Sequence, residues 1–346
     1  MSFRDDLAAL GYPRLDWIQV GITSSCNAAC IYCPHRVYQK AGRCRHMSMK
    51  VFSSLSPAFA RTGLVYLQGW GEPMLHPEFL TMLNLVKKKG AEAGVTSNAT
   101  LLTEERIKRL VDQGLDVLSF SVAGVEDRIN DQIRPGSPLK QVLKALETVH
   151  RVKARAGSPT PRIHLAHMLL ASRRRDIAKM ARFFNALALD QIVVSTLTLA
   201  VSPEMEKEKY PAKSPEDYEQ FKKELLDMRS DVDVRDRVFF HLYNPYAPPG
   251  ACSENIQRSC YVNVEGNILP CVYTDVSGKQ PVHKYFLSKK YPLYPLEFGQ
   301  LSSAALKKIW YGEKYRGFRA GMSKGLCPET CTVCCKRYIT DLKKEQ

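Results

Sequence analysis

Residues 23–35 read Thr-Ser-Ser-Cys-Asn-Ala-Ala-Cys-Ile-Tyr-Cys-Pro-His and place Cys26, Cys30 and Cys33 in a CxxxCxxC spacing. Three thiolates on one short loop can wrap one face of a compact inorganic core, and soft sulfur ligands favour iron–sulfur clusters, zinc or copper(I). A structural zinc site requires a closed set of four ligands. A four-iron cube held at three corners leaves one iron open, so the spacing favours a reactive iron–sulfur centre.

The spacing resembles the signature of the radical S-adenosylmethionine (SAM) superfamily, in which an aromatic residue, here Tyr32, precedes the last cysteine. The resemblance implies that the open iron chelates SAM and that one electron from the reduced cluster releases methionine and a 5′-deoxyadenosyl radical. That radical takes a hydrogen atom from a substrate carbon. Cys26, Cys30 and Cys33 are then the catalytic cluster ligands, and Tyr32 belongs to the cofactor site. The cofactors supply the difficult chemistry, and the protein binds, orients and excludes water.

A second motif follows the strand-like run at 64–68. Gly69-Trp70-Gly71-Glu72-Pro73 is similar to the GGEP motif of the same superfamily, with Trp70 at the place of its first glycine. In the family this turn receives the amino group of SAM, so the resemblance implies cofactor-binding roles for Gly69, Gly71, Glu72 and Pro73. Taken alone, the segment is an ordinary Gly/Pro turn. We expect Trp70 to shape the substrate side of the cavity.

Three later segments extend the predicted SAM site. Residues 93–100 resemble the TNGT-type strand end of the family, where Ser97 and Asn98 offer hydrogen-bonding groups to a ribose or a carboxylate. Ser119 and Ser121 lie on one face of a predicted strand by its two-residue period, and we expect that face to line the cavity. The segment 127–136 looks like the family's "hD…R" run and makes Arg134 a candidate for the SAM carboxylate. Taken alone, Asn98 fits an ordinary turn position and Arg134 fits a surface arginine in a long loop.

The order of predicted elements indicates an α/β fold. Strand-like runs at 17–22, 64–68, 93–100, 117–122, 163–170 and 191–199 alternate with helical segments at 49–60, 78–89, 104–112, 139–154 and 176–187. Such alternation predicts a parallel sheet, with catalytic groups at the carboxyl ends of the strands. His164 and His167 fall on opposite faces of their strand, so at most one of them faces the cavity.

With the motif order, this pattern resembles the family's partial (β/α)6 TIM-type barrel, here predicted over residues 14–205. A connector at 206–245 would contain one strong helix at 215–228. A small cysteine-rich auxiliary-cluster domain with a β-hairpin is expected over 246–340.

Seven of the eleven cysteines lie after residue 250. The segment 260–271 has a glycine turn between two strand-like runs, and 327–335 contains a CxxC pair. These features resemble the SPASM or twitch auxiliary-cluster domain. The full SPASM pattern holds two auxiliary 4Fe-4S clusters, but its CxxCx5CxxxC element is absent here. The resemblance therefore implies one auxiliary cluster; its expected ligands are Cys260, Cys271, Cys331 and Cys334, with Cys327 as the leading substitute.

The remaining cysteines keep alternatives open. Cys252 stands ahead of Gly266, as the first SPASM element requires, and Cys252 and Cys335 are either spare or part of a second, atypical cluster. Cys44 has no assigned role. A four-cysteine zinc ribbon would also fit the hairpin and the terminal CxxC.

Composition narrows the class of protein. The net charge is +15, but Lys87-Lys88-Lys89 and Arg173-Arg174-Arg175 fit solvated helical faces, and no nucleic-acid recognition motif is present. The charge instead favours attraction of an acidic electron donor such as flavodoxin or ferredoxin. No apolar run reaches transmembrane length, and no signal-peptide core is seen, so we expect no membrane partner and a cytoplasmic location. Clustered cysteines in that compartment indicate metal binding or catalysis rather than disulfides.

The sequence predicts a radical SAM oxidoreductase or maturase that uses SAM, one SAM-binding 4Fe-4S cluster and an auxiliary 4Fe-4S cluster. Its substrate is expected to be a peptide, a protein or a cofactor. One alternative is a radical SAM dehydrogenase acting on a small molecule such as a sugar or tetrapyrrole. The alternative of another class is a non-catalytic protein that binds zinc or an iron–sulfur cluster.

Overall fold

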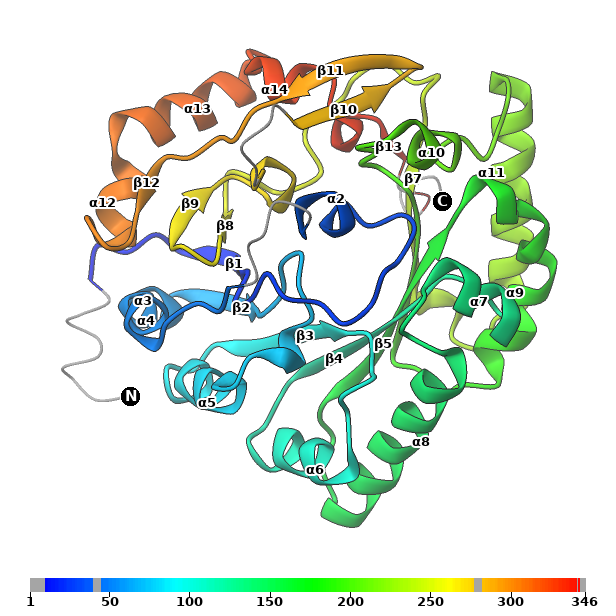
Figure 1. The fold of residues 1–346 in the computed structure, drawn as a ribbon, viewed down its shortest axis with the longest axis horizontal. Helices are drawn as coiled ribbons and strands as arrows, with labels where there is room; N and C mark the ends of the chain where they lie inside the picture. The colour runs from blue at the N-terminus through cyan, green and yellow to red at the C-terminus, as the bar shows by residue number, and fades with distance from the viewer. Residues whose placement is uncertain (1–9, 40–44, 277–281, 341, 343–346) are drawn as a thin grey trace.

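The computed structural model describes residues 10–39, 45–276, 282–340 and 342 of the 346-residue chain, and Cys44 therefore lies outside the described residues. An incomplete barrel of parallel strands is surrounded by helices, and the C-terminal third lies across its open side (Figure 1). Within the described residues, no helix is both long enough and apolar enough to cross a membrane.

Seven parallel strands form the barrel and neighbour one another in chain order. They are β1 (Leu15–Val20), β2 (Thr62–Tyr66), β3 (Glu92–Ser97), β4 (Val117–Val122), β5 (Arg162–Leu169), β6 (Gln191–Thr196) and β7 (Val238–Tyr243). The six strands expected from the sequence are present within a few residues of their predicted bounds. The seventh lies in the range 206–245, where we expected a connector, so the parallel sheet continues beyond residue 205.

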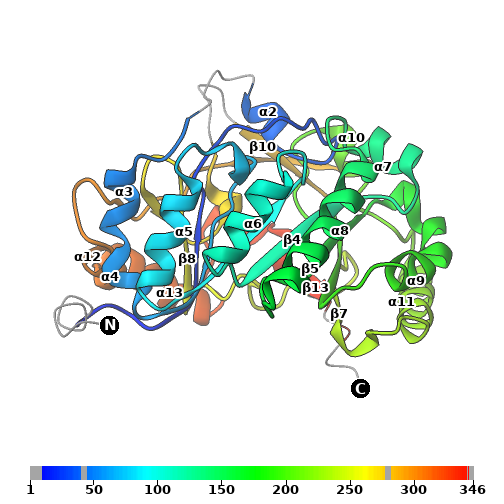
Figure 2. The same cartoon turned by 90° about the horizontal axis from the view of Figure 1, so that it is seen from below.

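The helices that precede residue 231 are α2 (His35–Gln39), α3 (Met49–Ser54), α4 (Ser56–Phe59), α5 (Phe79–Lys88), α6 (Glu104–Asp112), α7 (Asp127–Ile133), α8 (Leu139–Ala156), α9 (Ile177–Asn185), α10 (Pro203–Lys207) and α11 (Pro215–Ser230), with short 3-10 turns η1 (Pro73–Leu75), η2 (Ala171–Asp176) and η3 (Arg235–Arg237). Among them, α5, α6, α8 and α9 cover the outer face of the sheet (Figure 2), whereas α2 lies over the opening of the barrel (Figure 1). The segment predicted as one helix at 49–60 is divided at Leu55 because Pro57 lacks the amide that a continuous helix needs.

Strand β5 shows how the sheet separates core from cavity. Its residues alternate between buried and partly buried positions, and Ile163, Leu165 and Leu169 join the main hydrophobic core with residues of the surrounding helices. The opposite face of the strand turns toward the barrel interior. The core therefore lies between the sheet and the helices, and the interior remains available for a site.

The C-terminal third extends the barrel sheet at both edges. Strand β8 (Ser259–Val262) pairs in parallel with β1, β9 (Asn267–Leu269) forms an antiparallel hairpin with β8, and β12 (Gly299–Gln300) pairs with β9. At the far edge, β13 (Ile339–Thr340) pairs with β7. The result is an eleven-stranded sheet in the order β12-β9-β8-β1-β2-β3-β4-β5-β6-β7-β13.

The other elements of this region lie over the open side of the barrel (Figure 1). They are the separate hairpin β10 (Val282–Phe286) and β11 (Lys289–Leu293), the helices α12 (Leu306–Tyr311), α13 (Glu313–Ser323) and α14 (Glu329–Thr332), and the turns η4 (Val272–Thr274) and η5 (Cys335–Arg337). The predicted glycine turn is Gly266, which adopts φ +82° between β8 and β9, a backbone conformation that glycine accepts without strain.

Candidate functional site

The three cysteines of the CxxxCxxC motif follow β1 at the carboxyl edge of the barrel. Cys26, Cys30 and Cys33 line one cavity of about 490 Å³. Burial raises the pKa of the Cys26 thiol to about 11 and that of Cys33 to about 12. Buried thiols with such pKa values become thiolates when a metal compensates the lost hydration. The donor set of three convergent thiols therefore fits one face of an iron–sulfur cluster.

The Gly69–Pro73 turn packs directly against this cysteine loop. The Glu72 amide donates a hydrogen bond to the Ser25 carbonyl at 2.7 Å. A Cβ at Gly71 would lie 2.4 Å from the Thr23 carbonyl oxygen and 2.5 Å from that of Ser25, so only glycine fits there. The turn predicted from the GGEP resemblance thus lies beside the cysteine loop, and Gly69, Trp70, Gly71 and Glu72 line the same cavity.

Glu72 connects this turn to the end of β3 through hydrogen bonds. Its carboxylate accepts hydrogen bonds from the Ser97 hydroxyl at 2.8 Å, the Asn98 amide at 2.8 Å and the Met74 amide at 3.2 Å. Burial raises the pKa of Glu72, and the three donors oppose that shift. The structure brings Glu72, Ser97 and Asn98 together, as predicted for a cofactor site. Glu72 and Ser97, however, are hydrogen-bonded to each other. Pro73 begins η1 and is buried behind the turn.

Arg134 closes the other side of the cysteine loop. Its guanidinium donates hydrogen bonds to the Tyr32 hydroxyl and, at 3.3 Å, to the Ser137 hydroxyl, while its buried Nε has no partner among the described residues. The backbone supports this arrangement, because the amides of Ala29 and Ile31 donate to the carbonyls of Pro135 and Ile133. Arg134 lines the cavity together with Tyr32 and the three cysteines, so its guanidinium fits an anionic ligand.

Ser119 and Ser121 lie at different depths along β4, and His164 and His167 lie on opposite faces of β5. Ser121 lines the cavity, whereas Ser119 is buried beside the Tyr66 hydroxyl and is not part of the lining. His167 reaches the cavity wall and packs edge-on against Phe184, and burial lowers its pKa to about 4. His164 is not part of the lining. Ser121 thus lies on the cavity face of β4, whereas His167 shares the core face of Leu165 and Leu169 and borders the cavity from that side.

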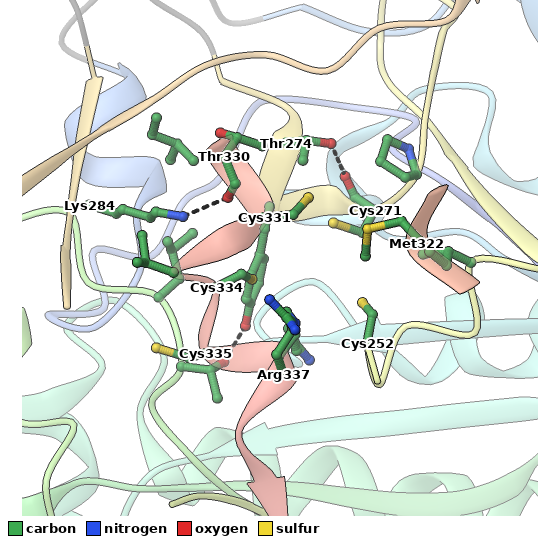
Figure 3. A pocket seen from close by; sticks show the side chains of 18 of the residues that line it. Cys252, Cys271, Thr274, Lys284, Met322, Thr330, Cys331, Cys334, Cys335 and Arg337 are labelled. Atoms are coloured by element: carbon green, nitrogen blue, oxygen red, sulfur yellow. Dashed lines mark hydrogen bonds between the residues drawn. The ribbon is translucent and has the colours of Figure 1, made fainter. Parts of the chain in front are cut away.

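Five cysteines of the C-terminal third line a second, smaller pocket: Cys252, Cys271, Cys331 and Cys334, with Cys335 at its edge (Figure 3). Burial raises the pKa of Cys252 to about 11, that of Cys331 to about 12, and that of Cys271 well above its ordinary value. A set of four soft thiol donors around one space fits an iron–sulfur cluster, whose binding would offset the cost of burying thiolates.

The lining of this pocket includes three of the four expected auxiliary ligands, Cys271, Cys331 and Cys334, and has Cys252 where Cys260 was expected. Cys260 does not line the pocket; it lies on β8, opposite Ile18 of β1, and its side chain joins the main hydrophobic core near Arg319. Cys252 occupies the corresponding place in the pocket. The signal for it was its spacing ahead of Gly266, which the nearby Cys260 obscured.

The two remaining cysteines lie apart from the four. Cys335 is at the pocket edge, but its sulfur points away from the sulfurs of Cys252, Cys271 and Cys331 (Figure 3). Cys327 lines an open groove with Leu326 and Phe298. Neither side chain enters the ring of four thiols.

The two sites share a wall. Thr198, Leu199, Tyr273 and Lys336 line both the cysteine pocket and the large cavity, and Glu254 lines the large cavity. The sequence analysis did not identify Glu254, Tyr273 or Lys336, because nothing in their local pattern separates them from ordinary surface residues. Their position follows only from the packing of the C-terminal third over the barrel.

Trp70 belongs to this wall. Its ring stacks on that of Tyr273 with centroids 6.1 Å apart and an interplanar angle of 13°, and its indole nitrogen donates to the Asp275 carbonyl at 3.3 Å. The Tyr273 hydroxyl is hydrogen-bonded to Thr198 of the barrel. The tryptophan in the GGEP-like turn therefore joins the SAM-side turn to the segment that carries Cys271.

Comparisons with known proteins agree with this geometry. Residues 20–184 match the family model described as the radical SAM superfamily, and residues 252–335 match the SPASM model, described as an iron–sulfur cluster-binding domain. A tungsten-containing aldehyde ferredoxin oxidoreductase cofactor-modifying protein of Pyrococcus furiosus is 25% identical over 95% of this chain and 90% of its own length. A PqqA peptide cyclase of Methylocella silvestris is 22% identical over 92% and 79%, respectively.

The fold is also similar to a solved structure, that of Streptococcus suis SuiB bound to S-adenosylmethionine. The two share 14% identity with a TM-score of 0.63 over 94% of this chain and 72% of that one. The two matched family models fall on the two cysteine sites in turn. The chain belongs to the radical SAM superfamily and carries a C-terminal SPASM iron–sulfur cluster-binding domain.

Proposed function

We propose that this radical SAM enzyme abstracts a hydrogen atom from a substrate carbon held in the cavity between its two cysteine sites, in the modification of a peptide, a protein or a cofactor. One observation carries the proposal. The cavity of about 490 Å³ reaches from Cys26, Cys30 and Cys33 to Tyr273 and Lys336, which border the auxiliary pocket. A molecule bound there would lie between the site of radical formation and the auxiliary cluster.

Cys26, Cys30 and Cys33 are the proposed ligands of the SAM-binding cluster. When bound, this cluster supplies one electron that converts SAM into methionine and a 5′-deoxyadenosyl radical. The chain's own residues orient the cofactor. Arg134, at the cavity wall, offers its guanidinium to a carboxylate, and the turn at 69–71 offers backbone groups beside the cysteine loop.

Asn98 is held in place for the same site. Its amide nitrogen donates to Asn27 at 2.9 Å and its oxygen accepts from Thr100. This pairing fixes the side chain at the cavity edge, next to the Glu72 carboxylate that anchors its backbone. We assign Asn98 and Ser121 to contacts with the polar parts of SAM, and Glu72 and Ser97 to positioning.

Cys252, Cys271, Cys331 and Cys334 are the proposed ligands of one auxiliary 4Fe-4S cluster. Their shared pocket supports this set, whereas Cys260 and Cys327 lie outside the pocket, and the sulfur of Cys335 at the pocket edge points away from the others (Figure 3). We therefore propose one auxiliary cluster rather than two.

The relatives matched over nearly the whole chain support the substrate class. One is named as a cofactor-modifying protein and the other as a peptide cyclase. The cavity floor offers uncharged hydrogen-bonding side chains, among them Gln19, Gln68 and Ser195. Such groups match the amides of a peptide or the ring substituents of a cofactor.

An acidic electron donor of the flavodoxin or ferredoxin type is the proposed redox partner, in a cytoplasmic setting. The net charge of +15 supports long-range attraction of such a protein. The prediction that follows is a reduction rate that falls as salt concentration rises, because exposed charges are screened.

Iron content tests the ligand sets. Anaerobically reconstituted wild type should bind about eight irons, and the triple variant C26A/C30A/C33A about four. C252S should also fall to about four, whereas C260S should retain about eight, since Cys260 lies in the core. A wild-type value of roughly twelve would require a second auxiliary cluster, and loss of cluster iron in a folded C260S would restore Cys260 as a ligand.

Formation of 5′-deoxyadenosine tests the division of roles. With dithionite as reductant, the triple variant should form none, because no site for SAM remains. C331A should still form 5′-deoxyadenosine, while conversion of the substrate falls. Circular dichroism must show each variant folded, since losing a cluster removes a folding constraint. A wild type that holds eight irons but never cleaves SAM would disprove the proposed function.

A further inference from the structure

Two lysine side chains lie buried beside the auxiliary cysteine pocket. Lys284 of β10 is only 5% exposed, and Lys336 has a side chain 18% exposed; both line the pocket. Lysine is among the residues least often buried without a charged partner. Removing an ammonium group from water is costly unless a negative charge compensates it. The position of these two cations therefore requires an explanation.

Carboxylates explain only one of them. Lys336 forms an ion pair with Glu254 at 2.6 Å. Lys284 donates instead to the Thr330 carbonyl at 2.6 Å and, within the described part of the chain, forms no ion pair with Asp or Glu (Figure 3). A backbone carbonyl satisfies a hydrogen bond but does not neutralise an ammonium charge.

The proposed cluster would supply the negative charge that Lys284 lacks, because both lysines lie close in sequence or by hydrogen bond to its proposed ligands. Thr330, which holds Lys284, directly precedes Cys331, and Lys336 lies two residues beyond Cys334. The Lys336 ammonium also lies 5.1 Å from the centre of the Tyr273 ring, in the wall shared with the large cavity. Lys336 thus approaches the proposed cluster from a segment that carries its ligands, and Lys284 approaches from β10 through its hydrogen bond to Thr330.

A 4Fe-4S cluster with four thiolate ligands carries a net charge of about −2 when oxidised and about −3 after one-electron reduction. Fixed positive charge at close range in a low-dielectric interior stabilises the more negative state more strongly. Net charge and hydrogen bonding around a cluster are among the factors that set its potential.

We propose that Lys284 and Lys336 are counter-charges of the auxiliary cluster and raise its reduction potential, and that Glu254 opposes them. The inference rests on the proposed auxiliary ligand set and goes beyond it by assigning redox roles to residues that bind no metal. Because Lys336 is shared with Glu254, the unpaired Lys284 carries the larger uncompensated charge. The arrangement favours a cluster that accepts an electron.

The test is an anaerobic redox titration followed by electron paramagnetic resonance. The full-length C26A/C30A/C33A background is used, so that only the auxiliary cluster contributes. K284M and K336M should each lower the midpoint potential, with K284M changing the reduction equilibrium by about tenfold, which is 59 mV for one electron. E254Q should move the potential in the opposite direction. K284R, which keeps the charge, should restore most of the wild-type value.

The matched control is K314M. Lys314 lies in the same domain but is exposed on α13, where water screens its charge, so its removal should leave the potential unchanged. If K284M loses its four irons, the same electrostatic effect is measured in K284Q, K336M and E254Q. Unchanged potentials in folded, iron-loaded lysine variants would overturn the inference and leave the lysines with a structural role.

The outcome is separable from that of the proposed function. Failure of the wild type to cleave SAM would reject the proposed function without moving these potentials. Unchanged potentials together with normal SAM cleavage would reject only the role of the lysines.

Discussion

Gly71 occupies the tightest contact of the SAM-side turn. Its backbone passes so close to the carbonyls of Thr23 and Ser25 that a methyl group cannot be added without moving the cysteine loop. Glycine at this position therefore serves close approach between two backbones, one of which carries the cluster ligands. Trp70 beside it has room because it turns toward Tyr273.

We expect G71A to displace the cysteine loop. Overpacking of this kind costs about 1–3 kcal/mol of folding free energy, and the rate of 5′-deoxyadenosine formation should fall at least tenfold. The control is G317A, since a Cβ at Gly317 of α13 meets no atom within 4 Å. Wild-type SAM cleavage by a folded G71A would show that the loop tolerates the shift.

Asp275 provides a pH-dependent prediction. Its carboxylate accepts hydrogen bonds from Tyr261 at 3.0 Å and Asn263 at 3.1 Å, and burial raises its pKa to about 6 from the ordinary 3.8. Between these values the folded state binds more protons than the unfolded state, so this group's contribution to stability falls as pH rises.

The measurement compares wild type with D275N at two pH values. From pH 5 to pH 7, wild type should lose about 1 kcal/mol of stability relative to D275N. Anaerobic urea unfolding at each pH gives the difference. A difference that stays constant with pH would mean that Asp275 is ionised at both.

The cysteine loop packs between two turns that belong to different βα units. One is the Gly69–Pro73 turn after β2, and the other is the turn between α7 and α8. A Cβ at Gly136 in the second turn would lie 2.7 Å from the Asn27 carbonyl oxygen. Both turns depend on close backbone approach, so the loop is positioned by rigid elements on either side.

Helix α6 belongs to neither of these turns, and it offers a separate test of helix stability. Thr103 is its N-cap, and its hydroxyl accepts a hydrogen bond from the Arg106 amide at 3.2 Å. T103A should cost about 1 kcal/mol of folding free energy, whereas T103S, which keeps the hydroxyl, should cost little. Urea unfolding measures the change, and 5′-deoxyadenosine formation should not change. A fall in SAM cleavage by T103A would indicate coupling between α6 and the site.

At the scale of the whole molecule, one sheet joins the barrel to the auxiliary region. Strand β8 pairs with β1, which delivers the cysteine loop, and β13 pairs with β7. A Cβ at Gly69 would lie 2.8 Å from the Tyr261 hydroxyl of β8. The two cysteine sites are therefore built on a continuous hydrogen-bonded framework.

We expect this framework to unfold as one unit. V262P should remove a backbone donor from the last residue of β8 and strain its pairing with β1 and β9, so that both clusters are lost in a single thermal transition at lower temperature. Circular dichroism and iron release, followed together, would measure this. Two separate transitions, with the barrel retaining four irons while the auxiliary region unfolds, would contradict it.

Much of this molecule could be predicted from contiguous sequence. Alternating apolar residues marked the six expected strands, and the CxxxCxxC spacing placed Cys26, Cys30 and Cys33 at the end of the first one. The seventh strand at Val238–Tyr243 was missed because it follows a charged, proline-interrupted stretch that masked its pattern. Ser119 was expected in the cavity because period alone gives the face of a strand but not the depth.

The sequence by itself determined the first cysteine site, because its three proposed ligands lie within eight consecutive residues and local geometry brings them together. Only the tertiary structure decided the second. Cys252 and Cys260 are near each other in sequence, but pairing of β8 with β1 turns Cys260 into the core and leaves Cys252 at the pocket. The same packing buries Lys284 and Lys336 beside the four thiols, since their positions depend on contacts between distant segments that no local pattern encodes.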